Sequence, residues 1–311
     1  MASVLEVVLP VFGILFLGYG AAWGGWFDEG AQRGLGLFVF NFAIPILLFR
    51  TLAQASLPPE PPWGLLLSYY LGTVGVFVAG MLGARLLGHR ALDMQAIVGF
   101  AGCFSNTVQI GMPLILKALG ERAALPLFLV IAFHGLLLIT LLTVVMELAR
   151  GSTGSLRRLP LNTARGLLGN PIIVGLLAGL GYNLLDLPLP AALDRIAGTM
   201  GEAVVPCALF SMGAGLSRYR IAGSLREAVL LVGLKNVLHP LLVYQLATRV
   251  FALNELWLMV TVLLAALPIG VNPFLFAQRY QVGAPAVTTA IVLSTALSVA
   301  TLSALLVWFR I

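Results

Sequence analysis

The chain has 311 residues, of which 60% are hydrophobic and only 10% are charged, and its mean hydropathy is +1.01. Because soluble domains carry about 25% charged residues, this composition excludes a protein that is hydrated on all sides and predicts an integral membrane protein. The net charge of +6 does not indicate nucleic-acid binding, since the basic residues lie in connections beside apolar segments rather than in one stripe. Cys103 and Cys207 are the only cysteines, so neither a disulfide framework nor a Cys/His metal site is expected.

The first apolar segment is predicted to be a transmembrane helix that stays in place. Residues 1–22 contain Glu6 and no Lys or Arg, so the basic start of a signal peptide is missing. About 20 apolar residues cross the hydrocarbon core, and by this measure the chain contains ten spans. They cover residues 4–23, 34–54, 63–87, 94–118, 124–148, 167–185, 197–217, 225–249, 255–279 and 284–308.

The short, turn-rich connections between these spans leave no room for a soluble domain. The predicted fold class is therefore an all-α integral membrane protein of ten transmembrane helices. Lys and Arg are unequally shared between alternate connections, with eleven on the side of the 150–165 connection and six on the other side. The positive-inside rule predicts that this connection is cytoplasmic, that both termini lie outside, and that the protein is a multi-pass protein of the cytoplasmic (inner) membrane.

The fourth and ninth spans are each interrupted near the middle by Asn, Gly and Pro. The interruptions lie within Cys103–Leu114 and Ala265–Phe276. A helix that breaks at membrane depth frees backbone N–H and C=O groups, which only protein or a wet cavity can satisfy. Paired breaks at matching places in the two halves are the best sequence indication of a secondary transporter's binding site.

Prolines recur at a nearly constant offset of 159–161 residues, which indicates an internal repeat. The matched pairs are Pro10 and Pro171, Pro45 and Pro206, Pro113 and Pro273, and Pro126 and Pro285. We interpret residues 1–150 and 167–311 as two five-helix repeats joined by a short cytoplasmic linker at 151–166. Because five is odd, the second repeat enters the membrane from the opposite side, so the repeats are inverted and the two breaks cross at the bilayer midplane.

Asn106 and Asn272 are the first candidates for substrate binding, because an amide both donates and accepts hydrogen bonds. The alternative is that they only cap the broken backbone, and the two roles are compatible. A half-helix that begins at each break adds free N–H groups and about half a positive charge, which can hold a small anion. Gln109, with Ser105 and Thr107, supplies further polar groups beside the first break.

Two glycines and two prolines at the breaks are expected to be architectural first and to contact substrate by proximity. Gly111 and Gly270 let the backbone leave the helix and the chains approach closely. Pro113 and Pro273 lack the N–H that would continue the helix. All four are included in the predicted substrate site.

Lys235 lies in the middle of the eighth span, followed by Asn236, His239 and Pro240. An intramembrane charge is a functional candidate by default, and Lys235 could balance an anion at the crossing. The alternative is snorkelling to an interface or pairing with a carbonyl. His134, in the fifth span, is a candidate proton relay or, more simply, a hydrogen-bonded structural histidine.

No Asp or Glu lies close to either break, so the sequence favours anionic or neutral cargo over a cation-exchange site. The sequence contains no nucleotide-binding loop, no H-E-x-x-H zinc-binding motif and no serine nucleophile elbow. We therefore expect neither an enzyme nor an ATP-driven pump, and no cofactor or metal.

The two breaks resemble those of the auxin efflux carrier family, and the resemblance covers essentially the whole chain. It is strongest in SNTVQIGMPL at Ser105–Leu114 and PIGVNPFLFAQRY at Pro268–Tyr280, with NFAIP at Asn41–Pro45 in the second span. Because the central connection is short, the chain is similar to the compact prokaryotic members of that family.

This resemblance implies a sodium/proton antiporter-like fold with crossed broken helices 4 and 9. It implies a scaffold of spans 1, 2, 6 and 7, a mobile transport part of spans 3–5 and 8–10, an elevator motion, and homodimers formed through the scaffold. In relatives the crossing prolines and the first asparagine line the substrate site. These residues correspond to Pro113, Pro273 and Asn106 in this chain. Plant members export the auxin indole-3-acetate, whereas bacterial members are linked to malate, malonate and other small carboxylates.

The sequence thus favours a secondary transporter, an exporter of a small organic carboxylate, with the lipid bilayer and a second copy of the chain as its partners. Two alternatives stay open. One is a membrane sensor or binding protein that uses the same pocket without translocation. The other is a solute symporter coupled to Na⁺ or H⁺, which the missing carboxylates disfavour.

Overall fold

The computed structural model describes residues 2–55, 57, 62–150, 169–219 and 225–311. The predicted linker at 151–166 lies outside these residues. The described chain is helical, and β-type pairing within it is confined to one isolated bridge. The α-helices are α1 (Ala2–Trp23), α2 (Glu29–Phe38), α3 (Ile44–Ala53), α4 (Trp63–Leu86), α5 (Leu92–Cys103), α6 (Met112–Leu119), α7 (Ala124–Arg150), α9 (Pro171–Leu184), α10 (Ala191–Glu202), α11 (Val204–Leu216), α12 (Leu225–Gly233), α13 (His239–Gln245), α14 (Glu255–Ala266), α15 (Asn272–Tyr280) and α16 (Ala284–Trp308).

Short turns of other helix types join several of these α-helices without a gap. They are the π-helical turns η1 (Val39–Ala43), η2 (Thr107–Gly111), η5 (Leu234–Leu238) and η6 (Leu246–Val250), and the 3₁₀ turn η3 (Glu121–Ala123). Three of the π turns end two residues before a proline, at Pro45, Pro113 and Pro240. A proline clashes with the carbonyl four residues earlier, and a π turn widens the helix at that point. The helix therefore continues past these prolines.

Six helical runs in the described part of the chain are long and apolar enough to cross a membrane. They are Glu29–Ala53, Trp63–Leu86, Glu121–Ala149, Ala191–Leu216, Leu225–Val250 and Ala284–Trp308. Apolar side chains on them, such as Leu82 and Val229, are exposed, as lipid contact requires. The chain is thus a multi-pass membrane protein, while the full count of ten spans stays a prediction.

Shorter apolar helices account for the predicted breaks. Leu92–Cys103 and Thr107–Leu119 divide the predicted span 94–118, and Glu255–Ala266 is separated from α15 in the predicted span 255–279. The interruption of both spans, predicted from their Asn, Gly and Pro residues, is confirmed.

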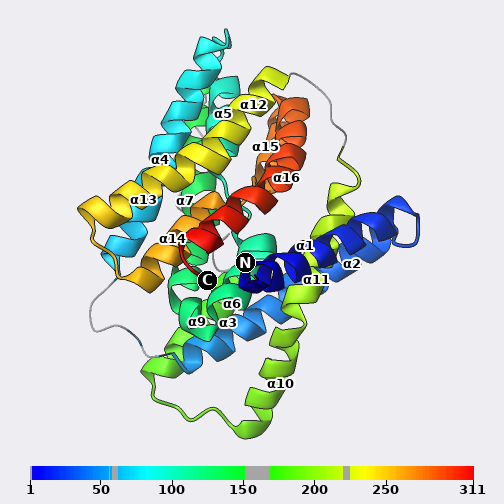
Figure 1. Cartoon of the computed structure of the whole chain (residues 1–311), viewed down its shortest axis with the longest axis vertical. Helices are drawn as coiled ribbons and strands as arrows, with labels where there is room; N and C mark the ends of the chain where they lie inside the picture. The colour runs from blue at the N-terminus through cyan, green and yellow to red at the C-terminus, as the bar shows by residue number, and fades with distance from the viewer. Residues whose placement is uncertain (1, 56, 58–61, 151–168, 220–224) are drawn as a thin grey trace.

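The helices pack in two groups, which Figure 1 shows in different parts of the view. In the first group α1 packs on α11, α3 on α9 and α10, and α2 on α11. Arg50 of α3 and Asp194 of α10 add an ion pair there, with Nε and Oδ1 2.7 Å apart. In the second group α4 packs on α5 and α13, α12 on α16, α13 on α14, and α5 on α7.

Two close helix contacts in the first group occur at the offset of the proline repeat. A Cβ on Gly18 of α1 would lie 2.1 Å from the carbonyl oxygen of Phe210, and a Cβ on Gly179 of α9 would lie 2.5 Å from that of Phe49. Gly179 follows Gly18 by 161 residues, and Phe210 follows Phe49 by 161. Each glycine lets a helix backbone touch its neighbour, so the same contact occurs twice in the fold.

Candidate functional site

The two helix breaks lie side by side and pair through their backbones. The first is the extended segment 104–106 between α5 and η2, and the second is the segment 267–271 between α14 and α15. Ser105 and Ile269 form an antiparallel bridge. The Asn106 N–H donates to the Pro268 carbonyl at 3.0 Å, and the Gly270 N–H donates to the Phe104 carbonyl at 3.0 Å. Each break therefore satisfies backbone groups of the other, as burial in a membrane requires.

A side chain of α7 supports the first break, and a side chain of α16 supports the second. His134 Nε2 of α7 accepts from the Ser105 N–H at 3.2 Å, and Ser294 Oγ of α16 accepts from the Ile269 N–H at 3.1 Å. These two residues are 160 positions apart, as are Pro113 and Pro273. His134 Nδ1 faces the Tyr69 hydroxyl at 3.3 Å. Since Nε2 accepts, Nδ1 carries the proton, and this is the arrangement of a structural histidine in its neutral form.

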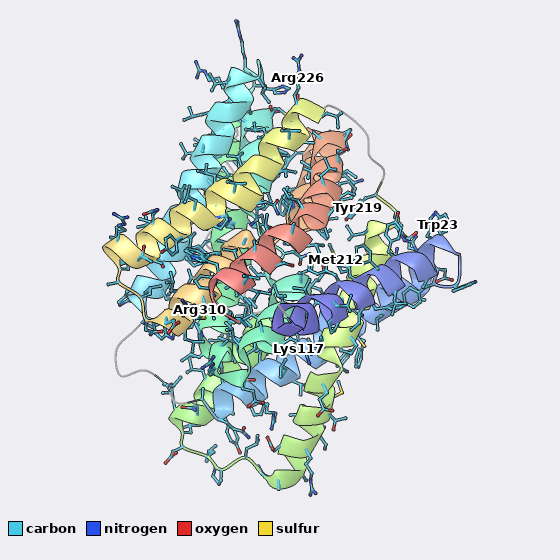
Figure 2. The ribbon with its side chains drawn as sticks, in the orientation of Figure 1. Trp23, Lys117, Met212, Tyr219, Arg226 and Arg310 are labelled. Carbon is cyan, nitrogen blue, oxygen red and sulfur yellow. The ribbon has the colours of Figure 1, made fainter. Side chains whose placement is uncertain are left out.

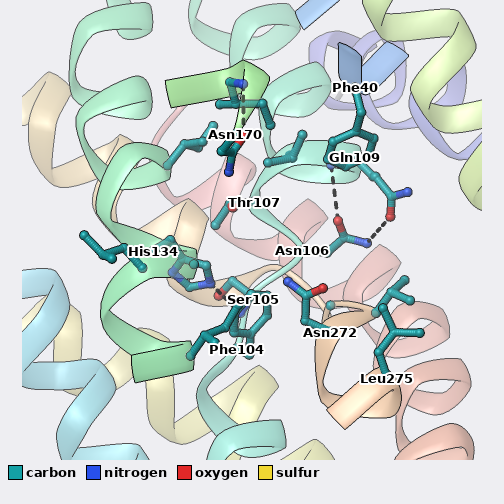
Figure 3. Close-up of a pocket in the computed structure, with 18 of the residues that line it drawn as sticks. Phe40, Phe104, Ser105, Asn106, Thr107, Gln109, His134, Asn170, Asn272 and Leu275 are labelled. Atoms are coloured by element: carbon teal, nitrogen blue, oxygen red, sulfur yellow. Dashed lines mark hydrogen bonds between the residues drawn. The ribbon is translucent and has the colours of Figure 1, made fainter. Parts of the chain in front are cut away.

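A cavity of about 750 Å³ lies against one side of this crossing (Figure 3). Its polar wall is built from the two breaks and their neighbours: Ser105, Asn106, Thr107, Gln109, His134, Gly270 and Asn272. Apolar walls come from both helix groups, for example Phe40 of η1, Ile139 of α7 and Met212 of α11. The cavity thus combines apolar walls with a few convergent polar groups, which is typical of a small-molecule site.

Asn106 and Asn272 both reach this cavity, but they differ in their bonds (Figure 3). Asn106 Oδ1 accepts from the Gln109 N–H at 3.2 Å, which caps η2. Its Nδ2 donates to Gln109 Oε1 at 3.4 Å and faces Met212 Sδ at 3.5 Å. The Asn272 side chain makes no hydrogen bond with any described residue. Its amide is therefore free to bind a ligand.

Three other predicted site residues are close to the crossing without lining the cavity. Gly111 packs beneath it, where a Cβ would lie 2.5 Å from Leu267 Cδ1. Pro113 and Pro273 are buried at the starts of α6 and α15. The position of these three residues fits their predicted architectural role. None of them lines the cavity, so the predicted substrate contact has no support in the geometry.

Lys235 is wholly buried and also lies outside the cavity lining. Its Nζ donates to the carbonyl of Ala265, in the last turn of α14, and faces His239 Nδ1 at 3.3 Å. The interpretation of Lys235 as a direct substrate contact therefore has no support in this geometry, whereas the alternative of a bond to a carbonyl is confirmed. Lys235 holds the end of the helix that leads into the second break.

Several lining residues were not identified from the sequence. They are Gln32, Asn170, Ser211, Met212, Tyr219 and Arg279. Figure 2 shows Met212 and Tyr219 on the α11 side of the molecule. Arg279 lies within the Pro268–Tyr280 motif, but its sequence position is that of a basic residue in a connection. The other residues carry no sequence pattern that distinguishes them from ordinary helix residues. Their role depends on helix packing.

The described residues include no group of three or more His, Cys, Asp or Glu side chains that could hold a metal ion. The cavity lining also carries little charge. Among the described residues that line it, Arg279 is the single charged side chain. The site is thus suited to binding a small polar or anionic molecule.

A comparison with protein families agrees with this geometry. A family model described as "Membrane transport protein" matches residues 3–306. The chain belongs to the membrane transport protein family. This family comprises transporters rather than enzymes, so the chain is a membrane transporter, and the resemblance to auxin efflux carriers is confirmed.

Relatives within this family cover nearly the full chain. A protein of Rhizobium meliloti (strain 1021) named "Putative malonate transporter" is 32% identical, with 100% of this chain and 97% of the relative aligned. An "Uncharacterized transporter" of Methanothermobacter thermautotrophicus is 27% identical over 96% and 95%. "Auxin efflux carrier component 8" of Arabidopsis thaliana is 25% identical over 83% and 84%.

Proposed function

We propose that this member of the membrane transport protein family moves a small organic carboxylate, bound where the two broken helices meet. The observation that carries the proposal is the Asn272 amide, which faces the cavity beside Asn106 and makes no bond to a described residue. A carboxylate can accept a hydrogen bond from the Asn272 Nδ2 group and is attracted to the N-terminal end of α15. The absence of acidic residues from the described lining agrees with an anionic ligand.

The names of the relatives support the same class of cargo. The Rhizobium relative carries malonate in its name, and the Arabidopsis relative carries auxin. Malonate and the auxin indole-3-acetate are both carboxylates. Because the Rhizobium relative is aligned over 97% of its length, we favour a small aliphatic carboxylate over an indole compound.

For the mechanism we propose alternating access by an elevator motion. The helix group of α4, α5, α7 and α12–α16 would carry the crossing, and the group of α1–α3 and α9–α11 would act as the scaffold. Two observations support this division: the denser packing within each group, and the repeated Gly18–Phe210 and Gly179–Phe49 contacts, which fit an inverted repeat. Cavity walls contributed by both groups would change when one group slides past the other.

We further propose export as the direction, a homodimer formed through the scaffold, and the inner membrane with both termini outside. The last point rests on the Lys and Arg bias between connections, part of which lies in residues outside those described.

The test is a binding and transport measurement on purified protein. Malonate, malate, longer carboxylates and indole-3-acetate are each added in thermal unfolding assays, since a ligand that binds only the folded state raises Tm with its concentration. Ligands that raise Tm are then tested for uptake into proteoliposomes. We expect a selective shift with a small carboxylate, and a loss of about 10- to 100-fold in affinity in Asn272→Ala, as for one hydrogen bond to a charged group.

Two results would contradict the proposal. A Tm shift with cationic or neutral compounds but with no carboxylate would overturn the anion interpretation. Binding of a carboxylate without uptake into liposomes would instead identify a membrane sensor that uses the same pocket.

A further inference from the structure

One face of α15 runs along the cavity from the crossing outward. Asn272, Leu275 and Arg279 all line the cavity, and their spacing of three and seven residues places them on one side of a helix. Asn272 is at the first position of α15, and Arg279 is in its last turn. A single rigid element thus carries a neutral amide at the inner end of the cavity and a cation farther out.

Arg279 is available for a ligand. Its side chain is exposed, and it forms no ion pair or hydrogen bond with any residue that the structure describes. By contrast, Arg33 and Arg218 pair with Glu29, and Arg50 pairs with Asp194. A cation that faces a cavity whose described lining contains no carboxylate will attract an anionic group into it.

The spacing along α15 fits a ligand with two acidic ends. Seven residues of helix separate the Asn272 and Arg279 Cα atoms by about 10 Å along the axis, at about 1.5 Å per residue. Helical side chains lean toward the N-terminus, so the long Arg279 side chain shortens the gap between its guanidinium and the crossing. Leu275 lies between the two polar residues along α15 and offers an apolar surface to a short carbon chain. Figure 3 shows Leu275 beside Asn272.

We propose that Arg279 binds the second carboxylate of a short linear dicarboxylate, whose first carboxylate is held at the crossing by Asn272. The inference rests on the proposed function and narrows its substrate class to dicarboxylates. An arginine is suited to this part because its planar guanidinium binds a carboxylate with two parallel hydrogen bonds.

The test compares dicarboxylates with monocarboxylates of equal carbon number: malonate with propionate, succinate with butyrate, and glutarate with valerate. Calorimetry on the purified full chain at one fixed ionic strength gives the Kd of each acid for wild type, Arg279→Gln and Arg279→Lys. We expect Arg279→Gln to weaken binding of the preferred dicarboxylate about 10- to 100-fold and to leave its monocarboxylate partner nearly unchanged. Arg279→Lys should retain part of the affinity, because an ammonium pairs without the bidentate geometry.

Arg226→Gln is the matched control. It removes the same charge from the exposed start of α12, which Figure 2 shows at the upper edge of the molecule, and Arg226 does not line the cavity. It should leave every Kd as in wild type. If Arg279→Gln weakens mono- and dicarboxylates equally, or weakens neither, the inference is wrong while the proposed function stands. If wild type binds no carboxylate, both are overturned.

Discussion

At the scale of single residues, the two asparagines of the breaks differ in the hydrogen bonds that their side chains make. Asn106 is 5% exposed and spends its amide on Gln109 and Met212. Asn272 is half-buried, and its amide has no bond to a described residue. The sequence treats the two as equivalents, but in the structure Asn106 caps η2, whereas the Asn272 amide is left for the proposed ligand.

This difference predicts that Asn106→Ala lowers the stability of the protein, whereas Asn272→Ala lowers its affinity for the carboxylate. Asn106→Ala removes the side-chain cap of η2, which should lower the free energy of unfolding by about 1 kcal/mol. Asn272→Ala removes no bond to a described residue, so its stability should stay within about 0.5 kcal/mol of wild type while carboxylate affinity falls. Thermal unfolding of both variants without ligand, followed by calorimetry with it, measures the two effects. Equal destabilisation by both substitutions would contradict the assignment.

At the scale of helices, small residues decide how closely the elements pack. Gly18 of α1 lies against the Phe210 carbonyl, and Gly179 of α9 lies against the Phe49 carbonyl. Two residues farther along, Gly20 and Gly181 have no heavy atom within 4 Å of the position of a Cβ. Gly20 is therefore a matched control for Gly18 within α1, and Gly181 is a matched control for Gly179 within α9.

We predict that Gly18→Ala and Gly179→Ala destabilise the protein and that Gly20→Ala and Gly181→Ala do not. A new Cβ at 2.1 or 2.5 Å from a backbone oxygen must push two helices apart, at the cost of an overpacked core, about 1–3 kcal/mol or more. At the open positions alanine improves helix propensity by about 0.5–1 kcal/mol. Thermal unfolding in detergent measures all four variants. Similar losses at the open and the closed positions would show that close packing is not the cause.

At the scale of the whole molecule, the cavity lies between the two helix groups, and several of its lining residues are near helix ends. Arg279 lies in the last turn of α15, Tyr219 follows α11, and Gln32 lies in the first turns of α2. By the Lys and Arg bias these ends belong to the side predicted to be cytoplasmic. The structure is thus expected to be the state that opens toward the cytoplasm.

Alternating access predicts that the crossing is reached from both sides in turn. Asn272→Cys, with Cys103 and Cys207 replaced by Ser, should react with a membrane-impermeant thiol reagent applied to the cytoplasmic face. Reaction from the opposite face should also occur, because the proposed motion exposes the same position there. Labelling of right-side-out and inside-out vesicles measures this. A cysteine reached from one face only, with or without substrate, would contradict transport by this motion.

Most of the architecture near the site could be predicted, because its causes are local. Asn, Gly and Pro within an apolar span interrupt a helix wherever they occur in the membrane. The same pattern at an offset of about 160 residues indicated that the two breaks meet. Ser105 and Ile269 are indeed paired in the structure.

The contents of the cavity could not be predicted in this way. The sequence context of Lys235 suggests a residue that binds an anion. Its ammonium instead donates to the carbonyl of Ala265, which lies 30 positions away in the chain. Arg279 resembles an ordinary loop cation in the sequence, yet it lines the cavity. Membership of the lining depends on the rotation of each helix and on its neighbours, and the apolar pattern is weak where a helix is hydrophobic on all sides.

The sequence by itself therefore determined a membrane protein with two broken helices, because low charge and helix-breaking residues act through local physical chemistry. The tertiary structure alone decided which polar groups remain free at the crossing. A hydrogen-bond donor is available to a ligand only when no protein group has taken it, and that depends on residues far away in the chain. Asn106, Asn272 and Lys235 are alike as polar residues within spans, and they differ only in the partners that folding brings to them.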